Sequence, residues 1–175
     1  MHILDVLENA VEAGASKIEL SIEEDLPNDL LRIKVADNGR GMDQDTVERV
    51  RDPFFSTRSS RRVGLGIPLF AAAAERCGGG LTIRSRAEEG TTVVATFRHS
   101  HIDRPPLGDM VSTLLCLILG QERVDLHYTH RVGTRVFEMD TEEVRARLGE
   151  VPLSHPAVRK WLREYLTEGL RSLRS

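Results

Sequence analysis

Two glycines, at positions 64 and 66, open an expected helix and could bind phosphate. The run GLGIPLFAAAAERC follows a loop without usable periodicity, and Pro68 lies near its first turn, where proline is tolerated. The N–H groups of a first helical turn have no partner inside the helix, so they are free to face phosphate oxygens. Taken alone, GLG also fits an ordinary helix start.

Two other segments place polar residues where they could join such a site. In DNGRGM, Asp37 ends an expected strand, and Gly39 and Gly41 allow backbone conformations that a side chain would block. In LENAVEAGAS, Asn9 lies on the polar face of an expected helix, near Asp5. Each has a simpler interpretation on its own, as a tight turn in the first case and as a solvated helix face in the second.

The periodicity of residues 1–98 predicts the elements that position these segments. Apolar residues at helical spacing predict a helix over the first dozen residues, and KIELSIEED and LLRIKVAD alternate as strands around the turn PND. A short helix at 43–51, a loop over DPFFSTRSSRRVG, the helix after GLG and a second hairpin, LTIRSR with TTVVATF, complete the order. We expect an α+β fold, a two-layer sandwich with three helices on a mixed, largely antiparallel sheet.

The composition changes at HSHIDRPPLG, which predicts a linker at 99–106 between a domain at 1–98 and a smaller unit at 107–175. The second unit is expected to be α/β, with an apolar helix at 110–119, two strands around 131–133 and two further helices. Trp161 and Tyr165 fall on the apolar face of the last helix, where packing is the simpler interpretation. This unit could dock a partner or form a homodimer.

Composition excludes several classes of protein. The formal net charge of −3 argues against a general nucleic-acid binder, and 5% aromatic residues give no sign of a base-stacking surface. The longest apolar run is too short to span a bilayer, and no signal peptide is evident. Cys77 and Cys116 are too far apart to suggest a disulfide framework, so a reduced cytoplasmic protein is expected.

Together these segments resemble the nucleotide-binding superfamily, often called GHKL, that includes sensor histidine kinases, DNA gyrase, Hsp90 and the MutL mismatch-repair proteins. LENAVEAGAS looks like its first box, DNGRGM its second, GLGIPLF its third and EEGTTV its late Gly-Thr element. The likeness covers residues 3–98, and DPFFSTRSSRRVGLGIPLF is most similar to the histidine-kinase branch. The resemblance implies a Bergerat-type ATP-binding fold with ATP and Mg²⁺ as ligands.

The resemblance assigns an adenine end and a phosphate end. Asp37 would accept a hydrogen bond from the adenine amino group, and Thr91 would help fix the base through its hydroxyl and a water. Asn9 would offer its amide oxygen to Mg²⁺, which prefers oxygen ligands. The remaining positions expected to contact the nucleotide are Gly39 and Gly41 beside the base, and Gly64, Leu65 and Gly66 at the phosphates.

The loop between the second and third boxes resembles the family's ATP lid. It is short and basic, and Arg58, Arg61 or Arg62 could pair with the triphosphate because a guanidinium matches phosphate oxygens in a fork geometry. Phe54 and Phe55 are expected to pack beneath it.

The chain departs from the family pattern at Asp5, where hydrolytic and serine-kinase relatives carry a glutamate that activates the nucleophile. A carboxylate one methylene shorter could act as the base through a water, but geometry decides proton transfer first. Only four residues precede Asp5, so we expect no phosphoacceptor helix pair upstream and a phosphoryl acceptor on another protein.

Three functions remain open at this point. The first is phosphoryl transfer from ATP to a partner protein, or slow hydrolysis, of the histidine-kinase type. The second is a non-catalytic switch that ATP orders, and the third is a MutL-like DNA-repair ATPase, against which the short lid argues. A metal site from His99, His101, His127 and His130 is a further alternative, without the partner motif that such sites usually have.

Overall fold

The computed structural model describes residues 1–52 and 65–175. Their helices and strands follow the order expected from the sequence. In chain order they are α1 (Ile3–Glu12), β1 (Lys17–Asp25), β2 (Leu30–Asp37), α2 (Gln44–Arg49), α3 (Gly66–Arg76), β3 (Gly80–Arg86), β4 (Gly90–Arg98), α4 (Met110–Gly120), β5 (Asp125–Val132), β6 (Arg135–Asp140), α5 (Thr141–Leu148) and α6 (Pro156–Ser172).

The six described strands form one sheet in the order β3-β4-β2-β1-β5-β6. All neighbours pair antiparallel except β1 and β5, which run parallel with Lys17 opposite Asp125. The expectation of a mixed, largely antiparallel sheet is therefore confirmed. The two strands expected in the C-terminal part, β5 and β6, extend the sheet that begins in the N-terminal part.

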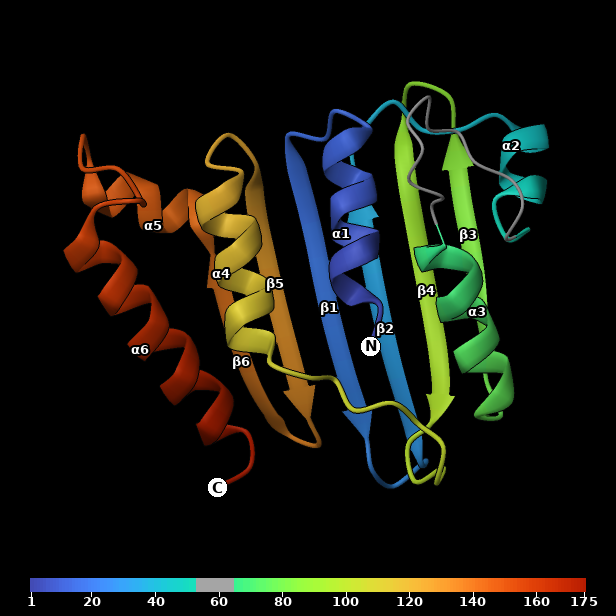
Figure 1. Ribbon diagram of the computed structural model, residues 1–175. Coiled ribbons are helices and arrows are strands. Elements are labelled where there is room, and N and C mark those ends of the chain that lie inside the picture. Colours follow the sequence, from blue (N-terminus) through green and yellow to red (C-terminus); the bar gives the residue numbers. More distant parts are fainter. Residues whose placement is uncertain (53–64) are drawn as a thin grey trace.

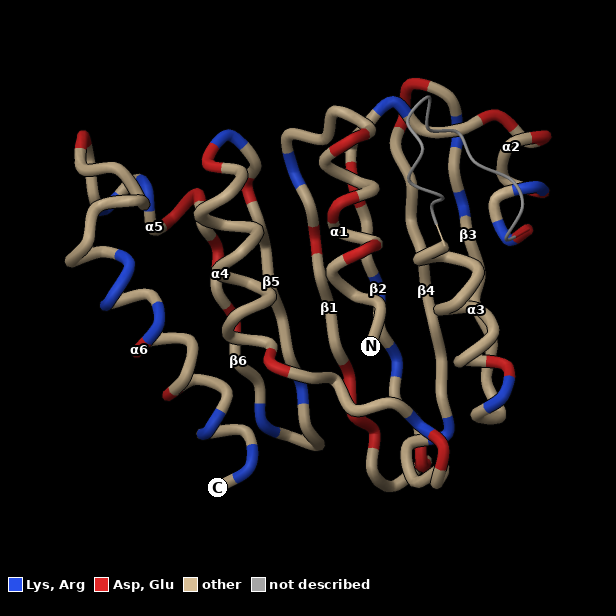
Figure 2. Tube along the Cα trace, viewed as in Figure 1, with Lys and Arg blue, Asp and Glu red and all other residues tan. Residues whose placement is uncertain are grey.

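Helices cover one face of this sheet, and α3, α1, α4 and α6 contact one another in that order (Figure 1). Alternate strand residues point beneath them, so that Ile18, Leu20 and Ile22 of β1 are buried. The opposite face is polar: Lys34 lies 3.0 Å from Glu19, and charged residues recur along β1 and β2 (Figure 2). The sheet therefore has one apolar and one solvated face, as the strand alternation predicts.

The segment between β4 and α4 is tied to the turn between β1 and β2. The Asp29 carboxylate accepts hydrogen bonds from the Ser100 backbone at 2.7 Å and from Arg98 Nε at 3.0 Å. These bonds, led by those from Ser100, hold the pKa of Asp29 at about 2. That residues 1–98 and 107–175 fold as separate units, joined by a linker at 99–106, stays a prediction.

No helix in the described ranges is long and apolar enough to cross a bilayer.

Gly169 lets α6 approach β6 closely. A Cβ built on Gly169 would lie 2.2–2.5 Å from ring atoms of Phe137, whose ring packs on Tyr165 with centroids 5.4 Å apart. Phe137 is itself buried. A side chain at position 169 would therefore push α6 off the edge of the sheet.

Replacing Gly169 with alanine should destabilise the fold by up to about 2 kcal/mol. Alanine gains about 1 kcal/mol of helix propensity, but overpacking a buried ring costs roughly 1–3 kcal/mol and here outweighs the gain. Urea unfolding of Gly169→Ala measures the difference, with Glu168→Ala on the exposed side of the same helix as the control. A stabilised Gly169→Ala variant would contradict the close packing of α6 on Phe137.

Candidate functional site

Helix α1 brings two of the predicted site residues to one side of the sheet. Ile3, Leu7 and Ala10 are buried against the core, whereas Asp5 and Asn9 are only partly buried. The Asp5 carboxylate lies 3.0 Å from the ring of His2, measured from Oδ2 to Nδ1. The sequence therefore predicted the helix and its polar face, but not the histidine that contacts Asp5.

The start of α3 packs directly on Asp5. A Cβ built on Gly66 would lie 2.5 Å from the Cβ of Asp5, so only glycine fits at this contact. The N-cap residue is Leu65, and no side chain in the described part of the chain caps the helix. Among the described residues, no side chain bonds to the first-turn N–H groups of α3, so these groups could face an anion beside Asp5.

Asp37 anchors the turn that follows β2 at the other end of α1. Its Oδ1 accepts a hydrogen bond from the Gly39 N–H at 2.8 Å, and the Arg40 N–H donates to the Ala13 carbonyl at 2.8 Å. A Cβ on Gly39 would lie 2.8 Å from Ala13. The turn is therefore seated on the last residues of α1.

Two glycines bring this turn against the hairpin of β3 and β4. Gly41 has a φ of +66° and a Cβ there would lie 1.9 Å from the Arg86 carbonyl oxygen. Gly90 has a φ of +106°, and a Cβ there would lie 2.0 Å from the Asp37 carbonyl oxygen. Neither position accepts a side chain, so the close approach of the two backbones depends on glycine at both.

The Asp37 carboxyl is partly buried, and this burial raises its pKa above the usual value. Hydrogen bonds from the backbone of Gly39 and Thr91 lower the pKa, but by less than burial raises it. Thr91 lies directly opposite Asp37 in the register of β2 and β4. The carboxylate thus keeps free lone pairs in a partly desolvated place, which suits a ligand that donates a hydrogen bond.

Asn38 holds the same turn from its other side. Its Oδ1 accepts hydrogen bonds from the backbone N–H groups of Ser16 and Lys17, both at 2.9 Å, and its amide donates to Ser16 Oγ. The sequence interpretation gave Asn38 no role of its own. Its place in DNGRG was the available signal, since asparagine commonly bonds to nearby backbone in turns.

The structure brings the described site residues together along α1. Asp37, Gly39, Gly41 and Thr91 gather at its C-terminal end, and Asp5 and Gly66 meet near its N-terminal end, with Asn9 on the helix between them. Arg58 and Gly64, together with the expected lid residues Phe54, Phe55, Arg61 and Arg62, lie outside the described residues.

The residues of this site lie in a part of the chain that matches a known protein family. The family model described as histidine kinase-, DNA gyrase B- and HSP90-like ATPase matches residues 2–101, more than half of the chain. The match runs from α1 through β4 and contains every residue of the site. The chain belongs to the histidine kinase-, DNA gyrase B- and HSP90-like ATPases.

Relatives within this ATPase family are sensor kinases of bacteria. Over 58 residues the chain is 38% identical to the sensor protein kinase FleS of Pseudomonas aeruginosa, a match covering 33% of this chain and 14% of that protein. Over 86 residues it is 33% identical to the sensor protein kinase PilS of the same organism, covering 49% of this chain and 16% of that protein. The chain therefore spans only a small part of the length of these relatives.

A solved structure resembles more of the chain than the family model covers. The N-terminal domain of a DNA repair protein superimposes with a TM-score of 0.54 at 11% identity, covering 79% of this chain and 50% of that one. At this identity the likeness is one of fold. It extends beyond the stretch matched to the ATPase family.

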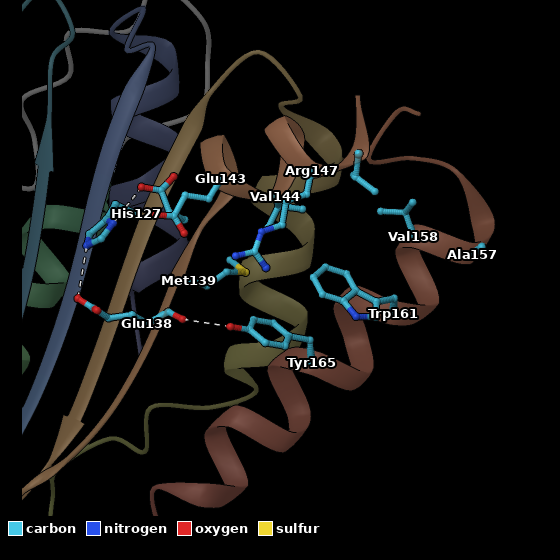
Figure 3. Close-up of a pocket in the computed structure, with 12 residues that line it drawn as sticks. His127, Glu138, Met139, Glu143, Val144, Arg147, Ala157, Val158, Trp161 and Tyr165 are labelled. Carbon is cyan, nitrogen blue, oxygen red and sulfur yellow. Dashed lines mark hydrogen bonds and ion pairs between the residues drawn. The ribbon is translucent and has the colours of Figure 1, made fainter. Parts of the chain in front are cut away.

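A cavity of about 510 Å³ lies away from the candidate nucleotide site, between β6, α5 and the first half of α6 (Figure 3). Trp161 and Tyr165 form one wall, with their rings stacked at a centroid distance of 5.2 Å. The Tyr165 hydroxyl donates to the Glu138 carbonyl at 3.4 Å. None of the described residues predicted to bind nucleotide lines this cavity.

A smaller cavity of about 310 Å³, at the ends of β1, β2 and β5, is lined in part by Asp37 and Asn38.

The histidines make structural contacts. Within 1–52 and 65–175, no group of three or more His, Cys, Asp and Glu residues could hold a metal ion. The buried Glu24 carboxylate instead lies 2.9 Å from Nε2 of His99, 2.9 Å from Nε2 of His130 and 2.8 Å from the guanidinium of Arg174. The Tyr128 hydroxyl lies 2.9 Å from Nδ1 of His130. These contacts connect β1, β5, the segment after β4 and the C-terminal end of the chain.

Proposed function

We propose that this chain binds ATP and Mg²⁺ along α1 and transfers the γ-phosphoryl group to a partner protein, or hydrolyses ATP slowly. The observation that carries the proposal is Asp37, a partly desolvated acceptor at the end of β2 beside glycines that leave no room for side chains. An acceptor so placed suits the amino group of adenine. The family match over residues 2–101 supports the same ligand.

The length of α1 fits a nucleotide laid along it. Asp5 and Ala13 are eight residues apart, about 12 Å at the helical rise of 1.5 Å per residue. The base would lie at the Ala13 end and the phosphates at the Asp5 end, where the start of α3, which no described side chain caps, would offer N–H groups at Leu65 and Gly66. This gives each end of ATP the chemistry it needs.

Asn9 lies between these ends and would supply an oxygen ligand for Mg²⁺. Magnesium keeps several waters and is typically held by one or two protein oxygens together with phosphates. When bound, the ion neutralises charge on the phosphates. The chain's own residues then position the γ-phosphoryl group, which is most of what catalysis of this transfer requires.

A second candidate is a non-catalytic switch, and the contacts of Asp5 favour it. The carboxylate that would act as the base is engaged by His2 and packed against Gly66. Nucleotide at the start of α3 would then change the contact between α1 and α3 rather than drive proton transfer. Such a change would alter how a partner protein docks on this chain.

The acceptor is proposed to be another protein, as the likeness to sensor kinases suggests. The part at 107–175 is proposed to dock that partner or to pair with a second copy. A cytoplasmic location accompanies the proposal, because ATP is supplied there.

Asn9→Ala and Asp5→Asn should separate the two functions. Asn9→Ala should remove the Mg²⁺-dependent part of ATP affinity, because it deletes a proposed metal ligand. Asp5→Asn should keep binding and lower phosphate release roughly a hundredfold, the usual contribution of a general base. Calorimetry with ATP, ADP and a non-hydrolysable analogue, with and without Mg²⁺, measures the binding, and labelled phosphate measures turnover.

Asn28→Ala serves as the control, since it removes the same amide from the turn at the opposite end of β2. Unchanged turnover in Asp5→Asn would favour the switch over the enzyme. An Asn9→Ala chain that binds ATP as the wild type does, with the same Mg²⁺ dependence, would contradict the proposed metal ligand.

A further inference from the structure

Ser85 lies in β3 next to the proposed base-binding end of the site. It shares the helix-facing side of the strand with Leu81 and Ile83, and its side chain is partly buried. A small polar residue at the end of an apolar stripe needs hydrogen-bond partners. The partners of Ser85 come from the turn after β2 and from the start of β4.

The Ser85 hydroxyl makes three hydrogen bonds. Its Oγ accepts from the Met42 N–H at 2.8 Å and donates to the Gly90 carbonyl at 2.9 Å. It also lies 2.7 Å from the Thr91 hydroxyl. A serine hydroxyl has one proton to donate and two lone pairs to accept with.

The one proton and two lone pairs of the Ser85 hydroxyl determine which hydroxyl donates in its bond with Thr91. The single proton of Ser85 goes to the Gly90 carbonyl, and one lone pair takes the Met42 N–H. The remaining lone pair can only accept, so the Thr91 hydroxyl donates to Ser85. The proton of Thr91 is thereby used inside the protein, and its Oγ1 has only lone pairs left for a ligand.

Thr91 and Asp37 therefore both act as hydrogen-bond acceptors towards a ligand. They are register partners on neighbouring strands, and the Thr91 backbone bonds to the Asp37 carboxylate. An ionised carboxylate only accepts, and so does Thr91 once Ser85 holds its proton. A water bridging the two would give both its protons to them and turn its oxygen to the ligand. Directly or through such a water, the pair favours a group that donates.

We propose that Ser85 is a positioning residue that sets the base specificity of the site by holding the Thr91 hydroxyl as a hydrogen-bond acceptor. The proposal rests on the proposed function, because it needs a purine at Asp37. A 6-amino purine donates to Asp37 from its exocyclic nitrogen, whereas a 6-oxo purine has a carbonyl at that position and donates only from N1. Two acceptors facing each other leave both without a partner, which is costly in a desolvated site.

The test compares the dissociation constants of ATP and inosine triphosphate, whose base carries a 6-carbonyl in place of the amino group. Wild-type chain should prefer ATP. In Ser85→Ala the proton of Thr91 is released and can donate to the carbonyl, so the preference should fall about tenfold. Ser85→Thr keeps the hydroxyl and should restore it. Ser21→Ala, on the opposite face of β1, should leave it unchanged.

Two further variants keep the test decisive. Ser85→Cys removes the hydroxyl with little loss of volume, and should reproduce the change if Ser85→Ala folds poorly. In a Thr91→Val background, Ser85→Ala should have no further effect on the preference, because the two hydroxyls act as one unit.

An equal loss of both affinities, with the preference unchanged, would overturn the proposal, since Ser85 would then only support the turn. A wild-type chain that binds neither nucleotide would overturn the proposed function, and this proposal with it.

Discussion

Asp37→Asn is expected to weaken ATP binding about 30-fold while leaving the melting temperature unchanged or higher. A hydrogen bond to a charged group contributes roughly 2 kcal/mol, which corresponds to that factor. Asparagine keeps the shape of the side chain but loses the ionised acceptor. The variant therefore separates the affinity of the site from the integrity of the turn.

The effect on stability follows from the raised pKa of Asp37. Burial raises that pKa in the folded chain, so the folded state holds the proton more tightly than the unfolded state does. Ionised Asp37 therefore lowers the free energy of unfolding at neutral pH, and this cost disappears as the pH falls through the raised pKa. Asparagine removes the cost at every pH.

Calorimetry with ATP and thermal unfolding at pH 7 and pH 5 measure the two effects. Asp103→Asn, an exposed carboxylate between β4 and α4, is the matched control and should change neither. Full ATP affinity in Asp37→Asn would place the base elsewhere. A melting temperature several degrees lower would show that Asp37 holds the turn together.

Local pattern accounts for the elements that the sequence predicted. Ile18, Leu20 and Ile22 alternate in the sequence and alternate between faces of the strand, so one strand can be recognised without its neighbours. The hairpin of β1 and β2 follows because its turn lies between adjacent strands. The order α, β, β, α, α, β, β is therefore readable from residues 1–98.

The parallel pairing of β1 with β5 could not be read in the same way. More than a hundred residues separate Lys17 from its partner Asp125, and no turn signal connects them. The alternation of Leu126, Tyr128 and His130 predicts a strand, but it does not indicate which strand pairs with it. The C-terminal part was accordingly expected as a separate unit, although its strands complete the sheet.

In the candidate site, too, residues that are close in the chain could be predicted, and residues that only the fold brings together could not. Asp37, Gly39 and Gly41 are close in the chain, so their turn was recognisable from the sequence. Ser85 and His2 act through contacts that only the fold creates, one across strands and one along a helix to Asp5. The stripe of Leu81, Ile83 and Ser85 was the one available signal, a polar residue on an apolar face.

Removing the charge of Glu24 is expected to have the largest effect on stability. Burial alone would raise the pKa of this carboxyl, but hydrogen bonds from His130 and His99 and the charge of Arg174 lower it from 4.5 to about 2. The side chain is 3% exposed, so water cannot replace these partners. Glu24→Gln should therefore lower the free energy of unfolding by about 3 kcal/mol at neutral pH.

The pH dependence gives an independent check on Glu24. A carboxyl whose pKa is lower in the folded chain stabilises the fold above its unfolded pKa of 4.5, and this contribution is lost as the pH falls towards 2. Wild-type chain should lose stability over that range more steeply than Glu24→Gln does. Urea unfolding at several pH values between 7 and 2 measures both slopes.

Glu23→Gln is the matched control, because the neighbouring Glu23 lies on the solvated face, 3.7 Å from Arg32. An exposed pair of this kind contributes at most about 1 kcal/mol. If Glu24→Gln were no more harmful than Glu23→Gln, the contacts of Glu24 would not hold the sheet together. If Glu24→Gln is the more harmful change, one carboxylate in β1 fixes β5, the segment after β4 and the C-terminal end of the chain. The sheet that carries the candidate nucleotide site then depends on His130 and Arg174, which lie outside the family match.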